Sequence, residues 1–393
     1  MKKIKKVGII TVSSVLVLFA LVVTLLQPVL SFGQNPPYEG QNVTNWKAPA
    51  FDQSKKTVLI VADNKQTELF DMLAPFYVFN ATEQLNVFIV AKTETPIPLK
   101  KDLFVLPQLT FDQVEKMNLQ AAVIVIPALS ARDENQDPVI INFIKTQTTP
   151  TTKLISICDG ATTAAATGLY DGRPITAHAT DYDCVKKNFD KPVWTQNITV
   201  TQSGNFYSTA GVANAVDGSL LIVEQLLGSE VRSRVARQLN YPHADIQLKH
   251  NSVALTFGNK MSIIRRVLFN KRKKLGLLLH NGLNELRFAS IVDTYSRTFP
   301  KEFKTFTLQD SVVKTQYGLT FIHSGDNKVN PKMDEVHVVM PESLSKEEET
   351  YFKGIELVKQ NSEVYPIDQC LIRIANQYGA HFAQIVKVTL DYN

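Results

Sequence analysis

Short, continuously apolar runs recur along the middle of the chain and alternate with longer amphipathic stretches. Apolar spacing predicts a helix over Glu68–Ala81, between the first two runs. Strands that lack polar alternation are buried on both faces, so helices must cover both sides of their sheet. The pattern therefore predicts an α/β fold, a three-layer sandwich around a mostly parallel sheet. The candidate strands are Thr57–Ala62, Asn86–Ala91, Ala121–Ile126 and Lys153–Ile157.

The chain is too long for one ordinary domain. Its 393 residues fit two domains of roughly 150 residues each. With 44% hydrophobic and 20% charged residues it has the composition of a folded protein. Three cysteines are too few for a scaffold built on disulfides, and an odd number leaves at least one thiol unpaired among Cys158, Cys184 and Cys370.

The amino terminus predicts a membrane anchor. A basic segment at 1–6 carries four lysines, and Val7–Phe32 then runs for 26 residues without a charge. About 20 apolar residues span a bilayer, and the run ends without a small-residue cleavage site, which favours an uncleaved signal anchor over a cleaved signal peptide. The positive-inside rule then places the rest of the chain outside the cytoplasm of a single-pass membrane protein. Secretion after cleavage is the alternative, and residues 33–54 read as a polar linker.

The net charge of +5 belongs mainly to those four lysines. The remaining chain has 38 Lys and Arg against 37 Asp and Glu, which gives no reason to expect a nucleic-acid partner.

One segment places a cysteine at an abrupt corner between a strand and a helix. The strand ends at Ile157, a Gly-Ala-rich helix begins at Gly160, and Cys158 lies between them. This is the layout of a nucleophile elbow, and a cysteine at a helix start is expected to ionise more readily than a free thiol. The alternative from spacing alone is a small buried hydrophobe.

Four blocks of this region resemble, in order, the ThiJ/PfpI (DJ-1-like) superfamily, close to its transcription-regulator-type and isocyanide-hydratase-like branches. The resemblance covers about Lys55–Pro242 and implies a flavodoxin-like sandwich with Cys158 at the elbow. The blocks are ICDGA, AAATGLYDGRPITAH, STAGVANAVDGSLLIVEQLLG and VARQLNYP.

The resemblance also implies two partners for the cysteine. Asp71, four residues before Pro75, matches the acidic residue whose protonated carboxyl donates a hydrogen bond to the thiolate. His178, twenty residues after Cys158, matches a histidine suited to be a general base or proton shuttle. A histidine tied to a loop carbonyl is the alternative. The candidate catalytic residues are thus Cys158, Asp71 and His178, with no cofactor and no metal.

Two departures from the family pattern argue against a peptidase. Ala128-Leu129 follow Pro127 where the family usually has two glycines, and Asp159 stands beside Cys158 where the family's proteases have histidine. A neighbouring carboxylate raises the pKa of a thiol.

The second part of the chain looks like a shortened copy of the first. The stretch from Lys274 matches the first strand and helix, pairing Glu285 with Glu68, and the last 26 residues match the end of the first unit, pairing Asp368 with Asp217. About 63 residues are missing between these blocks, in the interval that holds Cys158 and His178 in the first copy. In the second copy, Phe288 occupies the position that corresponds to Asp71. A chance similarity between two α/β units is the alternative.

These blocks divide the chain into a DJ-1/PfpI-like domain at 55–248, a basic connector at 249–272 and a degenerate repeat at 273–393. The repeat is expected to pack on the first copy as an intrachain pseudo-dimer; further oligomerisation is left open. The connector is interpreted as solvated, with binding to anionic lipid or nucleic acid as the alternative.

Two functions remain open. One is small-ligand binding or redox sensing through the cysteine pocket. The other is a cysteine-dependent hydrolase, hydratase or glyoxalase-like lyase acting on a small molecule. The sequence leaves the substrate or ligand unidentified.

Overall fold

The computed structural model describes residues 23–40, 49–131, 133–243, 245, 248–308, 311–325 and 332–392. The predicted basic segment at 1–6 and most of the predicted transmembrane helix at 7–32 lie outside these ranges; residues 23–30 of the apolar run are helical. Within the described residues, no helix combines the length and the apolar character needed to cross a bilayer.

The first unit is built on a seven-stranded sheet in the order β10-β11-β7-β6-β1-β2-β5. Its strands pair in parallel except β10, which runs antiparallel to β11. The four predicted strands are confirmed within one residue. The bounds are β1 Lys56–Ala62, β2 Leu85–Ala91, β5 Leu109–Thr110, β6 Ala121–Ile126, β7 Lys153–Ile157, β10 Val200–Ser203 and β11 Phe206–Thr209.

Helices cover both faces of this sheet, as the apolar strands require. On β1, Val58 and Ile60 pack in one buried cluster, and Leu59 and Val61 pack in another. The first cluster includes side chains of α2 (Leu69–Asn80), α7 (Ala215–Leu227) and α8 (Ser229–Gln238); the second includes those of α3 (Phe111–Lys116), α4 (Pro138–Gln147) and α5 (Gly160–Ala166). The α/β three-layer prediction is confirmed, and α2 lies where a helix was expected.

The second unit has a parallel four-stranded sheet in the order β13-β12-β16-β17. This order follows the same pattern as β2-β1-β6-β7 of the first unit. The bounds are β12 Lys274–Leu278, α10 Glu285–Ser296, β13 Glu302–Phe306, β16 Glu335–Val338, α11 Lys346–Tyr351, β17 Glu356–Lys359, α12 Pro366–Tyr378 and α13 Ala380–Thr389.

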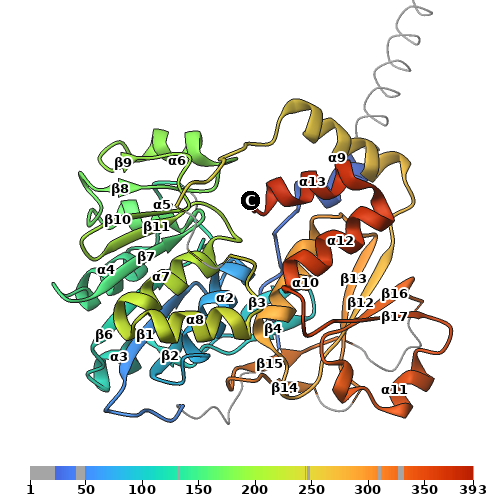
Figure 1. Cartoon of the computed structure of the whole chain (residues 1–393), viewed down its shortest axis with the longest axis horizontal. Helices are drawn as coiled ribbons and strands as arrows, with labels where there is room; N and C mark the ends of the chain where they lie inside the picture. Colours follow the sequence, from blue (N-terminus) through green and yellow to red (C-terminus); the bar gives the residue numbers. More distant parts are fainter. Residues whose placement is uncertain are drawn as a thin grey trace, which may run out of the picture.

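The two units share a third sheet. Strands β3 (Ile97–Lys100) and β4 (Leu103–Val105) of the first unit join β14 (Val312–Lys314) and β15 (Thr320–His323) of the second in the order β14-β15-β4-β3. Helices α2 and α10 also pack against each other across the joint, between the two larger sheets in Figure 1. The remaining elements are β8 Pro174–Ile175, α6 Tyr182–Asn188, β9 Val193–Trp194, α9 Phe257–Phe269 and a short 3-10 helix at Pro341–Ser343.

The last residues of the second unit are inserted into the first. The Asp391 carboxylate pairs with His250 at 2.6 Å and accepts a hydrogen bond from the Ala179 backbone N–H. The backbone N–H of Ala213 donates to the carbonyl of Leu390. Asp391 and His250 are both buried, so this contact between the units is shielded from water.

Candidate functional site

Cys158 occupies a strained corner between β7 and α5. Its φ is +55°, a left-handed conformation that non-glycine residues rarely adopt. The corner is tight because Gly160, the first residue of α5, lies against the backbone of Ile126 and Pro127 so closely that a Cβ atom would overlap it. The predicted elbow geometry is therefore present, and its strain is of the kind that clusters at functional sites.

Two acidic residues of α2 lie behind the cysteine. Glu68 caps the helix by accepting a hydrogen bond from the Asp71 N–H at 2.6 Å, and its own N–H donates to the carbonyl of Ala128. The Asp71 carboxyl is fully buried, and its Oδ2 accepts from the Ala128 N–H at 3.1 Å. Its Oδ1 has no partner among the described residues. The Ala128 N–H thus points at Asp71.

Burial raises the pKa of Asp71 well above its usual value, and the nearby Glu68 carboxylate adds to the effect. Burial and the neighbouring Asp293 raise the pKa of Glu68 to about 8. Glu68 therefore carries a proton at neutral pH, and the direction of the Asp71 shift agrees with the protonated role inferred for that residue.

The pKa of the Cys158 thiol is shifted in the direction opposite to the one expected. Burial raises the pKa of Cys158 well above that of a free cysteine, and the carboxylates of Asp71 and Asp159 act in the same direction. The Asp159 backbone N–H favours the thiolate, but this effect is smaller. The expected lowering of the cysteine pKa is therefore reversed, because the side chain is only 4% exposed.

His178 faces the same cleft as Cys158, but its ring is held by hydrogen bonds to backbone groups. Its Nε2 lies 3.2 Å from the carbonyl oxygen of Thr389, and its Nδ1 accepts from the Thr180 N–H. Burial lowers the pKa of His178, so the ring is neutral. Among the described residues no hydrogen bond joins His178 to Cys158. This is the arrangement of a histidine tied to a loop carbonyl.

Cys158, Asp159 and His178 line a cleft of about 1360 Å³ between the two units. The second unit contributes Asp293 and Arg297 from α10, which form a buried ion pair, and Arg297 also donates to the carbonyl of Thr389. Sequence reasoning missed both residues, because the second copy had been judged to lack site groups and nothing in the sequence indicates which residues of α10 face α2. Glu68 was also missed, although its place three residues before Asp71 on one helix was a usable signal.

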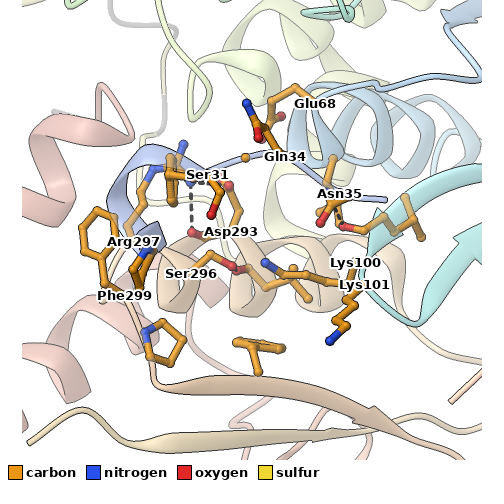
Figure 2. Close-up of a pocket in the computed structure, with 18 of the residues that line it drawn as sticks. Ser31, Gln34, Asn35, Glu68, Lys100, Lys101, Asp293, Ser296, Arg297 and Phe299 are labelled. Carbon is orange, nitrogen blue, oxygen red and sulfur yellow. Dashed lines mark hydrogen bonds and ion pairs between the residues drawn. The ribbon is translucent and has the colours of Figure 1, made fainter. Parts of the chain in front are cut away.

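The end of the apolar N-terminal run enters this cleft. Figure 2 shows Glu68, Asp293 and Arg297 around the stretch that carries Ser31 and Gln34. Phe32 packs on Phe299 with 5.4 Å between ring centroids, and Asn35 donates to the carbonyl of Leu99. The end of the apolar run and the described start of the predicted linker are thus together in contact with both units.

The outer part of the cleft is basic. Burial lowers the pKa of Lys100 to about 8, and its ammonium lies 5.2 Å from the ring centre of Phe303. Lys274 and Lys304 are paired with Glu302. The lysines that line the cleft are Lys100, Lys101, Lys260, Lys274, Lys301, Lys304 and Lys332. No group of three or more metal-ligating side chains occurs among the described residues.

The fold and the corner define an α/β sandwich protein with a buried elbow cysteine. Residues 55–225 match the DJ-1/PfpI family, and the chain thus contains a DJ-1/PfpI family domain. The suspected resemblance is confirmed for this part of the chain.

The regions aligned with two relatives make up about three quarters of the length of each relative. The isonitrile hydratase of Pseudomonas putida is 24% identical over 180 residues, 46% of this chain and 76% of the relative. The Parkinson disease protein 7 homolog of Danio rerio is 24% identical over 146 residues, 37% of this chain and 76% of the relative. Among solved structures, Drosophila melanogaster DJ-1beta aligns with a TM-score of 0.42 at 20% identity, covering 47% of this chain and 98% of that one. A ThiJ/PfpI family protein from Pseudomonas syringae aligns with a TM-score of 0.43 at 17% identity, covering 59% and 92%.

Proposed function

We propose that this chain is a membrane-anchored, extracytoplasmic DJ-1-like protein that binds a small molecule in the cleft at Cys158. The observation that carries the proposal is the cleft itself, which ends at the elbow cysteine and takes its walls from both units. Ligand sites commonly form such concave spaces at domain boundaries. The uncharged run at Val7–Phe32 supports the anchor, and its four preceding lysines support the orientation.

The second unit is proposed to be a degenerate copy that completes the site as a built-in partner. The shared strand pattern of β13-β12-β16-β17 and β2-β1-β6-β7 supports a duplication. So do the two glycines, Gly228 and Gly379, that separate the last two helices of each unit with φ near +90°. In this arrangement one chain needs no second copy to form its cleft.

The ligand is proposed to be a small organic anion. Seven lysines line the cleft, and only Lys274 and Lys304 form ion pairs with described carboxylates. The protonated Glu68 and the raised pKa of Asp71 leave the end of the cleft near the cysteine less negative than its composition indicates. A carboxylate or phosphate group would thus meet unpaired ammonium groups at the outer end.

Binding is favoured over redox sensing because the thiol is protonated. The thiolate is the form that peroxide oxidises, and the raised pKa of Cys158 keeps its population low at neutral pH.

Thermal unfolding of the full chain tests the proposal, with citrate, succinate, glutamate and inorganic phosphate as probes. At least one anion should raise the melting temperature. The variant Lys101→Gln, inside the cleft, should lose part of that shift, whereas the matched variant Lys191→Gln, an exposed lysine of the first unit paired with Asp171, should keep it. No shift with any of the anions, or equal loss in both variants, would contradict anion binding in the cleft.

The second candidate function is a cysteine-dependent hydratase. It is favoured by the left-handed corner at Cys158, by the raised pKa of the nearby Asp71, and by the similarity to isonitrile hydratase. Hydration of an isonitrile would add one water to its terminal carbon and yield an N-substituted formamide.

Two measurements separate the candidates. The alkylation rate of Cys158 against pH, measured in the Cys184→Ser background because Cys184 is an exposed thiol, should give a pKa above that of free cysteine. A value well below it, together with formamide release from an isonitrile that Cys158→Ala abolishes, would establish the hydratase instead.

A further inference from the structure

The connector helix α9 has two different sides. Ile263 and Val267 are buried, and the Arg266 guanidinium stacks on the rings of Tyr378 and Phe382 at 3.9 and 4.5 Å. These contacts fix the inner side of the helix against α12 and α13.

The outer side is strongly apolar. Phe257 and Phe269, at the two ends of α9, are each 79% exposed, and Met261 between them is 44% exposed. They recur at multiples of four residues and so lie along one side of the helix. Two phenylalanines left this open on one helix are uncommon for a surface that faces only water.

The same helix lies in a stretch without negative charge. Residues 246–284 contain no Asp or Glu and eight Lys or Arg. Lys273 and Lys274 are paired with carboxylates of the second unit, whereas Lys260 and Arg265 on α9 form no ion pair with any residue that the structure describes. Apolar side chains flanked by free basic groups are the pattern of a helix that lies in a membrane interface.

The predicted anchor reaches the protein beside α9. Pro28 and Val29 line the same cleft as Lys260, Ile263 and Ile264, and Figure 1 shows the start of the described chain, in blue, near α9 and α13. A span of about 20 residues that begins at Val7 ends at Leu26. Leu26 and Pro28 lie on the same helix, at residues 23–30, about 3 Å apart along its axis, so the bilayer surface must lie close to this edge of the protein.

We propose that the outer side of α9 docks on the surface of a bilayer rich in anionic lipid. Phe257, Met261 and Phe269 enter the boundary between headgroups and acyl chains, while Arg265 contacts the lipid phosphates. The inference rests on the proposed anchoring for its geometry. Docking fixes the orientation of the ligand cleft relative to the membrane, which a flexible tether would not do.

The test places a fluorescent reporter on each of two exposed apolar positions in the full chain, reconstituted in nanodiscs that contain brominated lipid. Phe269→Trp reports on α9, and Val312→Trp, at the 41% exposed Val312 of β14, is the matched control. With phosphatidylglycerol present, bromine should quench the Phe269→Trp signal at least about twofold more than the control, because quenching requires contact with the acyl region. Equal signals from the two reporters overturn the proposal.

The charge requirement is tested in the Phe269→Trp chain by measuring binding to phosphatidylglycerol vesicles. Arg265→Gln should weaken the quenching interaction about fivefold, and Lys191→Gln should leave it unchanged. Quenching that is the same with phosphatidylcholine alone, or unchanged by Arg265→Gln, overturns the anionic preference.

Alkaline carbonate extraction separates this inference from the proposed anchor. A chain that is extracted from membranes contradicts the anchor, and the contrast between the two reporters still decides the docking of α9. A chain that resists extraction but shows equal reporter signals keeps the anchor and loses the docking. If Phe257→Ser and Phe269→Ser instead convert a larger assembly to a smaller one in sedimentation, α9 binds a second copy of the chain and the proposal is wrong.

Discussion

The two α/β units share a strand pattern but differ at the position that matters for chemistry. In the first unit α2 carries Asp71, a fully buried carboxyl with one oxygen unpartnered. In the second unit α10 carries Phe288 at the matching position, fully buried with its ring 5.1 Å from that of Phe321. The first unit thus has polar groups in a costly environment at this position, and the second has ordinary core packing. The difference is what the proposed degenerate second copy predicts.

Exchanging these residues is the strongest test of the comparison. Phe288→Asp should destabilise the chain by about 4 kcal/mol, because it removes a buried ring and buries an unpaired carboxyl. Asp71→Asn should change stability by less than about 1 kcal/mol, because it removes a buried ionisable group while keeping the shape. Urea unfolding midpoints give both values. Equal losses would mean that the two positions have the same structural role.

The joint between the units should depend on Asp391. Asp391→Ala leaves His250 and the Ala179 N–H buried without this partner, and a loss of about 3 kcal/mol is expected. Glu349→Ala removes an exposed ion pair with Lys359 and should cost less than about 1 kcal/mol. Hydrogen exchange would show whether the extra loss in Asp391→Ala is located at residues 178–180 and 389–391. A uniform change across both units would contradict a local joint.

The corner at Cys158 should be intolerant of a single methyl group. Gly160→Ala places a Cβ against the backbone of Ile126 and Pro127, so about 2 kcal/mol of stability is expected to be lost. Gly258→Ala is the control, since the nearest atom outside its own helix backbone is 3.8 Å away. Thermal unfolding compares the two. A Gly160→Ala chain as stable as the control would show that the corner relaxes freely.

The remaining prediction concerns the pH dependence of stability. The folded chain holds a proton on Glu68 up to a pKa of about 8, whereas the ordinary value is 4.5. The folded state therefore binds more protons than the unfolded state between these values, and this contribution to stability is lost as the pH rises through about 8. Glu68→Gln should flatten the decline in stability between pH 5 and about 8, while the exposed Glu349→Gln should keep the wild-type slope. A wild-type slope in Glu68→Gln would mean that Glu68 is ionised in the folded chain.

The sequence predicted the first unit well because its strands are continuously apolar. β1, β2, β6, β7 and α2 lie within one residue of their predicted ends. β17 was missed, because Glu356–Lys359 has only four residues and a charged, exposed residue at each end, although it holds the same place beside β16 as β7 holds beside β6. The second unit thus has a strand within the interval that was predicted to be missing.

The site was predicted in part. The corner at Cys158 was predicted from local spacing and Asp71 from the family resemblance, and the structure has Cys158 between β7 and α5 and Asp71 on α2. The raised pKa of Cys158 could not be predicted from the sequence, because it depends on burial and on carboxylates that the fold brings near the thiol. Asp293 and Arg297 approach the cleft only through the packing of α10 on α2, a contact between residues more than 200 positions apart.

The sheet shared by the two units has a consequence for synthesis of the protein. Val105 of β4 pairs with Phe321 of β15, so this edge of β4 stays unpaired until more than 200 further residues have been translated. At roughly 5–20 residues per second this delay is about 10–40 s, during which an unpaired strand edge is open to other chains. We therefore expect the nascent first unit to need protection by a chaperone until β15 has been made.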